Sequence, residues 1–168
     1  MKHIISLLFY LAPIWLIAQK QITETSVKRI FTESIVKKNN GRFTFPSELS
    51  WNFQNEDSLY YKQDTLTAIR YKSTKHKKMC EIVNWSFYKK NKFILGKESL
   101  CKEPPSGSAT KYPQDYFTIA IYRVENEIMI DILNQNKIIM ESFIVLEMDQ
   151  NDERDKIILV RRFNPFEK

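Results

Sequence analysis

The two cysteines of the chain, Cys80 and Cys101, constrain the fold more than any other feature. They stand near the two ends of Met79–Lys102, in which apolar and polar side chains alternate on both sides of a Lys/Asn turn. A period of two is typical of a β-strand that buries one of its faces. The segment therefore predicts a β-hairpin with a cysteine at each open end.

The spacing of the hairpin predicts its register. A two-residue turn at Lys90-Asn91 places Lys89 opposite Lys92 and, counted outward, Cys80 opposite Cys101. This would be a non-hydrogen-bonded pair, in which the Cα atoms lie about 4.5 Å apart, within the range that a disulfide accepts. A three-residue turn would shift the register by one residue and require a bulge. We predict the two-residue turn and the disulfide Cys80–Cys101.

Alternation also assigns the two faces of the hairpin. Val83, Trp85, Phe87 and Ile94 share one face, with Trp85 over Gly96. We predict that this face points inward and that the disulfide lies on the outside. With other aromatic residues, the inward side chains either line a cavity for an apolar ligand or fill the core. The candidate lining residues are Trp51, Phe53, Val83, Trp85, Phe87 and Phe117.

Around the hairpin, the chain predicts one helix and a series of strands. Residues 24–38 carry apolar side chains at helical spacing, which predicts a helix that packs on a sheet or lies on a membrane surface. Alternating segments from about 42 to 163, one of them Leu59–Lys62, predict eight or nine strands. A meander of this length either closes or leaves exposed edges. We expect a mainly β fold, an antiparallel up-and-down barrel of roughly eight strands.

The first 19 residues predict the compartment. Lys2 and His3 precede the apolar run Ile4–Ile17, which is too short to span a bilayer comfortably. This is typical of a cleaved signal peptide, and an uncleaved anchor is the alternative. No cysteine follows the run directly, so we do not expect a lipid anchor. We expect a secreted or periplasmic protein with a single domain at 20–168 and no transmembrane segment after cleavage, a setting that permits a disulfide.

Charge and composition argue against several functions. Removal of residues 1–19 lowers the basic side chains from 26 to 25, against 20 acidic ones, so we do not expect nucleic acid as a partner. Two cysteines and one remaining histidine, His76, are too few for a zinc site, and we expect no metal or cofactor. His76 stands beside no nucleophile motif, so we predict no catalytic residue and no enzymatic activity.

Acidic residues in strands leave one catalytic alternative open. Glycosidic chemistry would require two carboxylates that face each other across a cleft. The strand acids are Glu81, Glu98, Asp131 and Glu141. We expect them to be outward residues of the meander.

Two further segments are candidates for contacts with partners. Arg70–Lys78 holds the one basic cluster, which suits an anionic surface or a fatty-acid carboxylate, or keeps a sheet edge soluble. Glu103–Gln114 contains three prolines and is the most loop-like stretch of the chain. Loops of this length are often functional, although many are simply mobile.

Several segments resemble the lipocalin-like, calycin-type β-barrel proteins that bacteria export. They are WNFQNEDSL around Trp51, CEIVNWSF with Cys80, Trp85 and Phe87, and DYFTIAIYRVENEIMIDIL. The resemblance covers residues 41–163, and the early Gly-x-Trp motif of the family has its nearest counterpart in Gly41-Arg42-Phe43. It implies an eight-stranded barrel with an N-terminal helix at one end and, often, a small apolar ligand.

Two functions follow as hypotheses. The first is a binding protein that holds a small hydrophobic ligand in the barrel. The alternative is an envelope-associated protein-interaction or structural module with a filled core and no ligand. A secreted hydrolase is a third, weaker hypothesis, which two facing carboxylates in a cavity would support.

Overall fold

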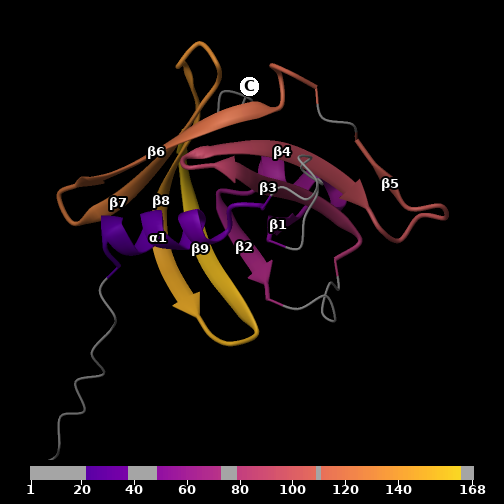
Figure 1. The fold of residues 1–168 in the computed structure, drawn as a ribbon, viewed down its shortest axis with the longest axis horizontal. Helices are drawn as coiled ribbons and strands as arrows, with labels where there is room; N and C mark the ends of the chain where they lie inside the picture. Colours follow the sequence, from indigo (N-terminus) through magenta and orange to yellow (C-terminus); the bar gives the residue numbers. More distant parts are fainter. Residues whose placement is uncertain (1–21, 38–48, 73–78, 109–110, 164–168) are drawn as a thin grey trace, which may run out of the picture.

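The computed structural model describes residues 22–37, 49–72, 79–108 and 111–163. Within these ranges the chain forms one N-terminal helix, a short helical connection and a single antiparallel sheet (Figure 1). The predicted signal peptide, the start of the first predicted strand near residue 42, and His76 with most of the basic cluster lie outside the described residues.

The elements have the following bounds. The helical elements are α1 (Glu24–Glu33), the 3-10 turn η1 (Glu56–Ser58) and α2 (Leu59–Lys62). The strands are β1 (Trp51–Gln54), β2 (Thr65–Tyr71), β3 (Glu81–Lys89), β4 (Lys92–Ser99), β5 (Ser106–Gly107), β6 (Tyr116–Val124), β7 (Glu127–Leu133), β8 (Ile139–Gln150) and β9 (Arg154–Phe163).

Eight of these strands close into an antiparallel barrel, and β5 lies outside it on the edge of β4. The order around the barrel is β3-β1-β2-β9-β8-β7-β6-β4, and β4 pairs back with β3. The predicted mainly β, eight-stranded barrel is confirmed. From β6 to β9 the strand order follows the chain, whereas β1 lies between β2 and β3.

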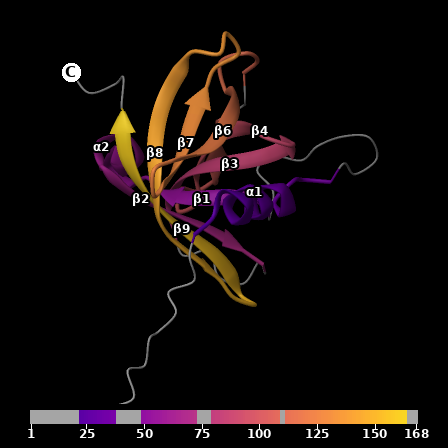
Figure 2. The ribbon, with the colours of Figure 1, turned by 90° about the vertical axis from the view of Figure 1, so that its left-hand side faces the viewer.

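Helix α1 covers one end of the barrel. Thr23 and Ser26 form a reciprocal capping box, in which each side chain accepts the backbone N–H of the other residue. The buried face consists of Val27, Ile30 and Phe31, and the helix packs against β6 and β3 (Figure 2). It ends at Glu33, earlier than the predicted boundary at 38, because Val36 already donates its N–H to the carbonyl of Phe87 in β3 (2.7 Å).

The strand predicted at Leu59–Lys62 is wrong, because these residues form α2. Asp57 and Ser58 have positive φ angles of 53° and 63°, which turn the chain sharply after β1. The helical turn places Tyr60 inside the barrel, fully buried. A run of four residues is too short for its pattern to distinguish a strand from a helix, and here tertiary packing decides.

The cysteine hairpin has the predicted turn but a different register. Lys89 pairs with Lys92 across Lys90-Asn91, as predicted. Between Phe87 and Lys89 the register then shifts by one, so that Phe87 pairs with Phe93 and Glu81 with Ser99. Tyr88 is the extra residue, a β-bulge. The alternation within β3 does not reveal this bulge, because only Lys89 follows it before the turn.

The bulge corrects three details of the predicted hairpin. Trp85 pairs with Leu95, and Asn84 is the residue opposite Gly96. A Cβ atom at position 96 would lie 2.7 Å from Asn84 Oδ1, so the glycine makes room for this amide and not for the indole. Ile94 pairs with Ser86 and therefore lies on the outer face, away from Trp85.

The disulfide Cys80–Cys101 is confirmed, with Cα atoms 5.0 Å apart. Because of the bulge, Cys101 is not directly opposite Cys80; the carbonyl of Cys80 instead accepts the N–H of Leu100 (2.7 Å). Cys101 is exposed. The predicted location on the outside is therefore also confirmed.

Candidate functional site

The predicted lining residues do come together inside the barrel. Trp51, Phe53, Val83, Trp85 and Phe87 are each at most 1% exposed, and Phe117 is half-buried against the same core. The predicted inward face of β3 is thus confirmed.

These aromatic side chains contact one another. The ring centroids of Phe53 and Trp85 lie 4.7 Å apart, and those of Trp85 and Phe93 lie 5.0 Å apart. From α1, Phe31 adds a ring 5.3 Å from Trp51. Such separations are direct ring contacts. The rings therefore fill the middle of the interior. Of the two predictions for this region, a ligand cavity and a packed core, the ring contacts agree with the packed core.

A polar network lies at the end of the barrel where α2 packs. Tyr60 accepts a hydrogen bond from Trp85 Nε1 (3.2 Å) and donates one to Glu141 Oε1 (3.4 Å). Arg161 pairs with the Glu141 carboxylate and donates to the carbonyl of Tyr60 (2.6 Å). All four side chains are buried, so the hydrogen bonds among them replace the hydrogen bonds that their polar groups would make to water.

Burial shifts the protonation of two groups in this network. It raises the pKa of Tyr60 well above its ordinary value, and the nearby Glu141 charge adds to the shift. Burial also raises the pKa of Glu141, and the charge of Arg161 offsets this only in part. The network is closed on itself, so we assign it a structural role.

A second buried ion pair removes two cations from the predicted basic cluster. The Arg70 side chain donates from Nε to Asp155 Oδ2 (2.7 Å), and both residues are buried. Lys72 lies 3.1 Å from the other oxygen of Asp155. Glu33 lies 3.8 Å from Arg70 and adds a second acid to the cluster. Both cations are therefore engaged with acids of the fold, which leaves the anion-binding hypothesis to the part of the cluster outside the described residues.

The strand acids do not meet as a catalytic pair among the described residues. Glu141 points into the barrel, where it is paired with Arg161, so the expectation that this acid faces outward is wrong. Asp131 belongs to the outer face and accepts hydrogen bonds from Tyr122 (2.8 Å) and Ser142 (2.6 Å). Glu98 accepts a hydrogen bond from the Asn84 amide (2.8 Å). Each of these three carboxylates thus has its own partner, and none of these partners is a carboxylate.

A groove opens in the barrel wall between β1 and β2. β1 pairs with β3 along all four of its residues, but with β2 only at Asn52↔Ile69 and Phe53↔Ala68. Beyond Gln54 the chain stays with β3, because Asn55 donates its N–H to the carbonyl of Glu81 (2.9 Å). Residues 65–67, at the start of β2, therefore have no partner in β1. This separation creates a cavity of about 320 Å³.

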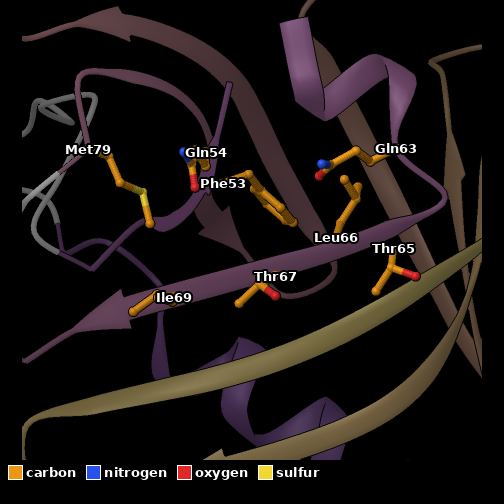
Figure 3. Close-up of a pocket in the computed structure, with 8 residues that line it drawn as sticks. All are labelled: Phe53, Gln54, Gln63, Thr65, Leu66, Thr67, Ile69 and Met79. Atoms are coloured by element: carbon orange, nitrogen blue, oxygen red, sulfur yellow. The ribbon is translucent and has the colours of Figure 1, made fainter. Parts of the chain in front are cut away.

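The groove has an apolar floor and a neutral polar rim. Phe53 and Leu66, buried residues of β1 and β2, point towards each other at its centre, between Met79 at one end and Gln63 at the other (Figure 3). Thr65, Thr67 and Ile69 project outward from β2, since alternate residues of a strand share a face. The eight lining residues are Phe53, Gln54, Gln63, Thr65, Leu66, Thr67, Ile69 and Met79.

Of the predicted lining residues, only Phe53 contributes to this groove. The other groove residues were missed, because the groove forms where two strands separate and no local pattern marks that point. One signal was present in the sequence: the polar run Asn55–Ser58 ends the first strand at Gln54, before it can cover the first residues of β2.

The described ranges contain no helix with the length and apolar character needed to cross a bilayer. Nor do they contain a group of three or more His, Cys, Asp or Glu side chains arranged to hold a metal ion.

Fold and site together define a closed antiparallel β-barrel with a packed aromatic interior and a lateral groove. The chain matches no known protein-family model, no curated protein and no solved structure. Its function is therefore argued from its own geometry.

Proposed function

We propose that this is a lipocalin-like binding protein that holds a small, largely apolar molecule. The observation that carries the proposal is the groove between β1 and β2, where the apolar side chains of Phe53 and Leu66 form a floor that solvent can reach. Its volume of about 320 Å³ falls within the size range of small-molecule sites.

The proposed site differs from the one first expected. Trp85, Phe87 and Phe93 already contact one another in the middle of the interior. A ligand there would have to displace packed rings, whereas a ligand in the groove would bind on top of Phe53 and Leu66. The groove is the place where binding requires the least rearrangement.

Export to the envelope or outside the cell belongs to the same proposal. The apolar run after Lys2 and the disulfide Cys80–Cys101 support it. We propose that the protein binds its ligand without chemical conversion, because the carboxylates of Glu98, Asp131 and Glu141 are each occupied by a hydrogen-bond or ion-pair partner.

A substitution that fills the groove tests the proposal. Thr67→Phe places an aromatic ring in the groove from an exposed strand position, where aromatic residues are well tolerated. We expect the wild-type protein to bind the neutral apolar probe N-phenyl-1-naphthylamine, and Thr67→Phe to weaken binding about tenfold or more, equivalent to about 1.4 kcal/mol. Fluorescence titration measures both affinities, and native mass spectrometry of the purified protein tests for a retained ligand.

Thr118→Phe is the matched control, because Thr118 is also an outward-facing threonine of a barrel strand but does not line the groove. Its probe affinity should equal that of the wild type. Equal binding by Thr67→Phe and wild type, or no binding by wild type, would contradict the proposal. Near-UV circular dichroism of each variant confirms that the aromatic interior is intact.

A protein-interaction module is the second candidate, and one observation favours it. Tyr112, in the proline-containing segment 103–114, is 72% exposed. Its ring packs edge-on against Tyr116 (5.1 Å), which in turn contacts Tyr88 (5.8 Å). Exposed tyrosines supported by other rings are common at protein interfaces. Failure to bind the probe, together with capture of one envelope protein that Tyr112→Ser abolishes, would favour this candidate.

A further inference from the structure

We infer that the groove between β1 and β2 selects an uncharged amphipathic molecule, one that carries hydroxyl groups along one edge and an apolar chain or face. This inference rests on the proposed function and adds the chemical class of the ligand.

The first argument is the absence of charge among the described residues that line the groove. Four of its eight lining side chains are apolar and four are neutral hydrogen-bonding groups, so none of them carries a charge. A charged head group placed here would lose part of its hydration without gaining a counter-ion. Such a transfer is far more costly than burial of a hydroxyl that finds a hydrogen-bond partner.

Two charged groups in the described part of the chain lie next to the groove and already have partners within the fold. The Glu56 carboxylate accepts the backbone N–H of Cys80 (3.1 Å) and also interacts with the side chain of Gln54. Arg161, which lies behind Gln63, is engaged by Glu141 and by the carbonyl of Tyr60. Glu56 is thus engaged through Oε1 with the start of β3, and Arg161 is engaged with Glu141.

The second argument is the placement of the hydroxyl groups. Thr65 and Thr67 are alternate residues of β2, so their side chains stand on the same face, about 7 Å apart along the strand. Both are exposed, and their hydroxyls make no hydrogen bond to any residue in the described part of the chain. Each hydroxyl both donates and accepts, which suits a ligand with two neighbouring hydroxyl groups of its own.

The apolar residues define the rest of the ligand. Phe53 and Leu66 are 1% and 3% exposed and present their surface only at the groove floor, while Ile69 and Met79 are half-buried beside them. An apolar chain on this floor would be removed from water on one side. A monoacylglycerol combines such a chain with a neutral diol and is therefore a suitable probe of this chemistry.

Displacement of N-phenyl-1-naphthylamine from the full-length mature protein tests the inference. The competitors share one chain length and differ only in the head group: monodecanoylglycerol, decanol, decanoate and decylammonium, each below its micelle concentration. We expect monodecanoylglycerol to bind about tenfold more tightly than decanoate or decylammonium, because the groove offers hydrogen bonds but no counter-ion.

An isosteric double variant tests which residues recognise the head group. Thr65→Val/Thr67→Val removes both hydroxyls and keeps the shape and the β-branched side chains, which suit a strand. We expect the affinity for monodecanoylglycerol to fall about tenfold, while that for decanol changes less than about twofold. Thr118→Val is the matched control and should change neither value.

The outcomes separate this inference from the proposed function. Equal or tighter binding of decanoate or decylammonium would overturn the inference, as would an unchanged preference for the diol in Thr65→Val/Thr67→Val. Probe binding that remains sensitive to Thr67→Phe would still support the groove as a binding site in both cases. Absence of probe binding to the wild type would instead remove the proposed function itself.

Discussion

At the scale of single residues, Arg161 and Glu141 form a deeply buried ion pair. The side chains are 3% and 6% exposed, and the Arg161 guanidinium also lies over the ring of Phe143, 5.0 Å from its centroid. Two charges buried this deeply stabilise the fold only as a pair. Either charge alone would have neither water nor an opposite charge to compensate it.

Removal of one partner should therefore cost more than removal of both. We expect Arg161→Met to lower the free energy of unfolding by about 3–5 kcal/mol. The double variant Arg161→Met/Glu141→Leu should recover most of this loss, since no uncompensated charge remains. Urea unfolding of the two variants, of Glu141→Leu and of the wild type forms a double-mutant cycle. Additive effects of the two substitutions would show that the pair is not coupled.

At the scale of elements, Glu56 links the turn η1 to the start of β3. Its carboxylate accepts the backbone N–H groups of Cys80 (3.1 Å) and Glu81 (3.4 Å). Partial burial acts to raise the pKa of Glu56, but the backbone hydrogen bonds and the contact with Gln54 outweigh it, and the net pKa is lowered. The charged carboxylate thus holds together two elements that border the groove.

A lowered pKa in the folded state has a defined consequence for stability. The contribution of Glu56 is fully present above the ordinary pKa of a glutamate and is lost as the pH falls through the lowered value. We expect Glu56→Gln to be less stable than the wild type at neutral pH, and the difference to vanish in acid. Thermal unfolding from about pH 7 to about pH 3 measures this difference. Glu153→Gln, an exposed substitution on the β8–β9 turn, is the control, and a difference that is constant with pH would contradict the prediction.

At the scale of the whole molecule, the disulfide Cys80–Cys101 acts mainly on the unfolded chain. It closes a loop between residues 21 positions apart on the outside of a barrel whose strands are already paired. Such a link restricts the unfolded ensemble far more than it changes the folded contacts.

We therefore expect Cys80→Ser/Cys101→Ser to fold into the same barrel with lower stability. The free energy of unfolding should fall by about 3 kcal/mol, while the circular dichroism spectrum stays that of the wild type. Urea unfolding of the oxidised protein and the double variant measures the loss, and peptide mapping without reduction verifies the bond. Equal stability of the two proteins would contradict this role.

The class of the fold and much of the hairpin could be predicted from the amino-acid sequence alone. Alternation with a period of two identified the face of Trp85 as interior, the Asn91 turn and the disulfide, because these features depend on neighbours along the chain or across one turn. The helix before Lys38 followed from its apolar spacing for the same reason. Closure of the barrel followed from the need to pair every edge.

The bulge at Tyr88, the helical turn at Tyr60 and the groove between β1 and β2 depend instead on how the strands pack in three dimensions. Each of these features results from a choice between partners that are distant in the sequence. The bulge aligns Phe87 with Phe93, the turn brings Tyr60 to Trp85, and β1 follows β3 and leaves β2. Periodicity describes the surroundings of each residue along its own strand. It contains no information on where two neighbouring strands separate. The proposed binding site, the groove between β1 and β2, lies at such a point.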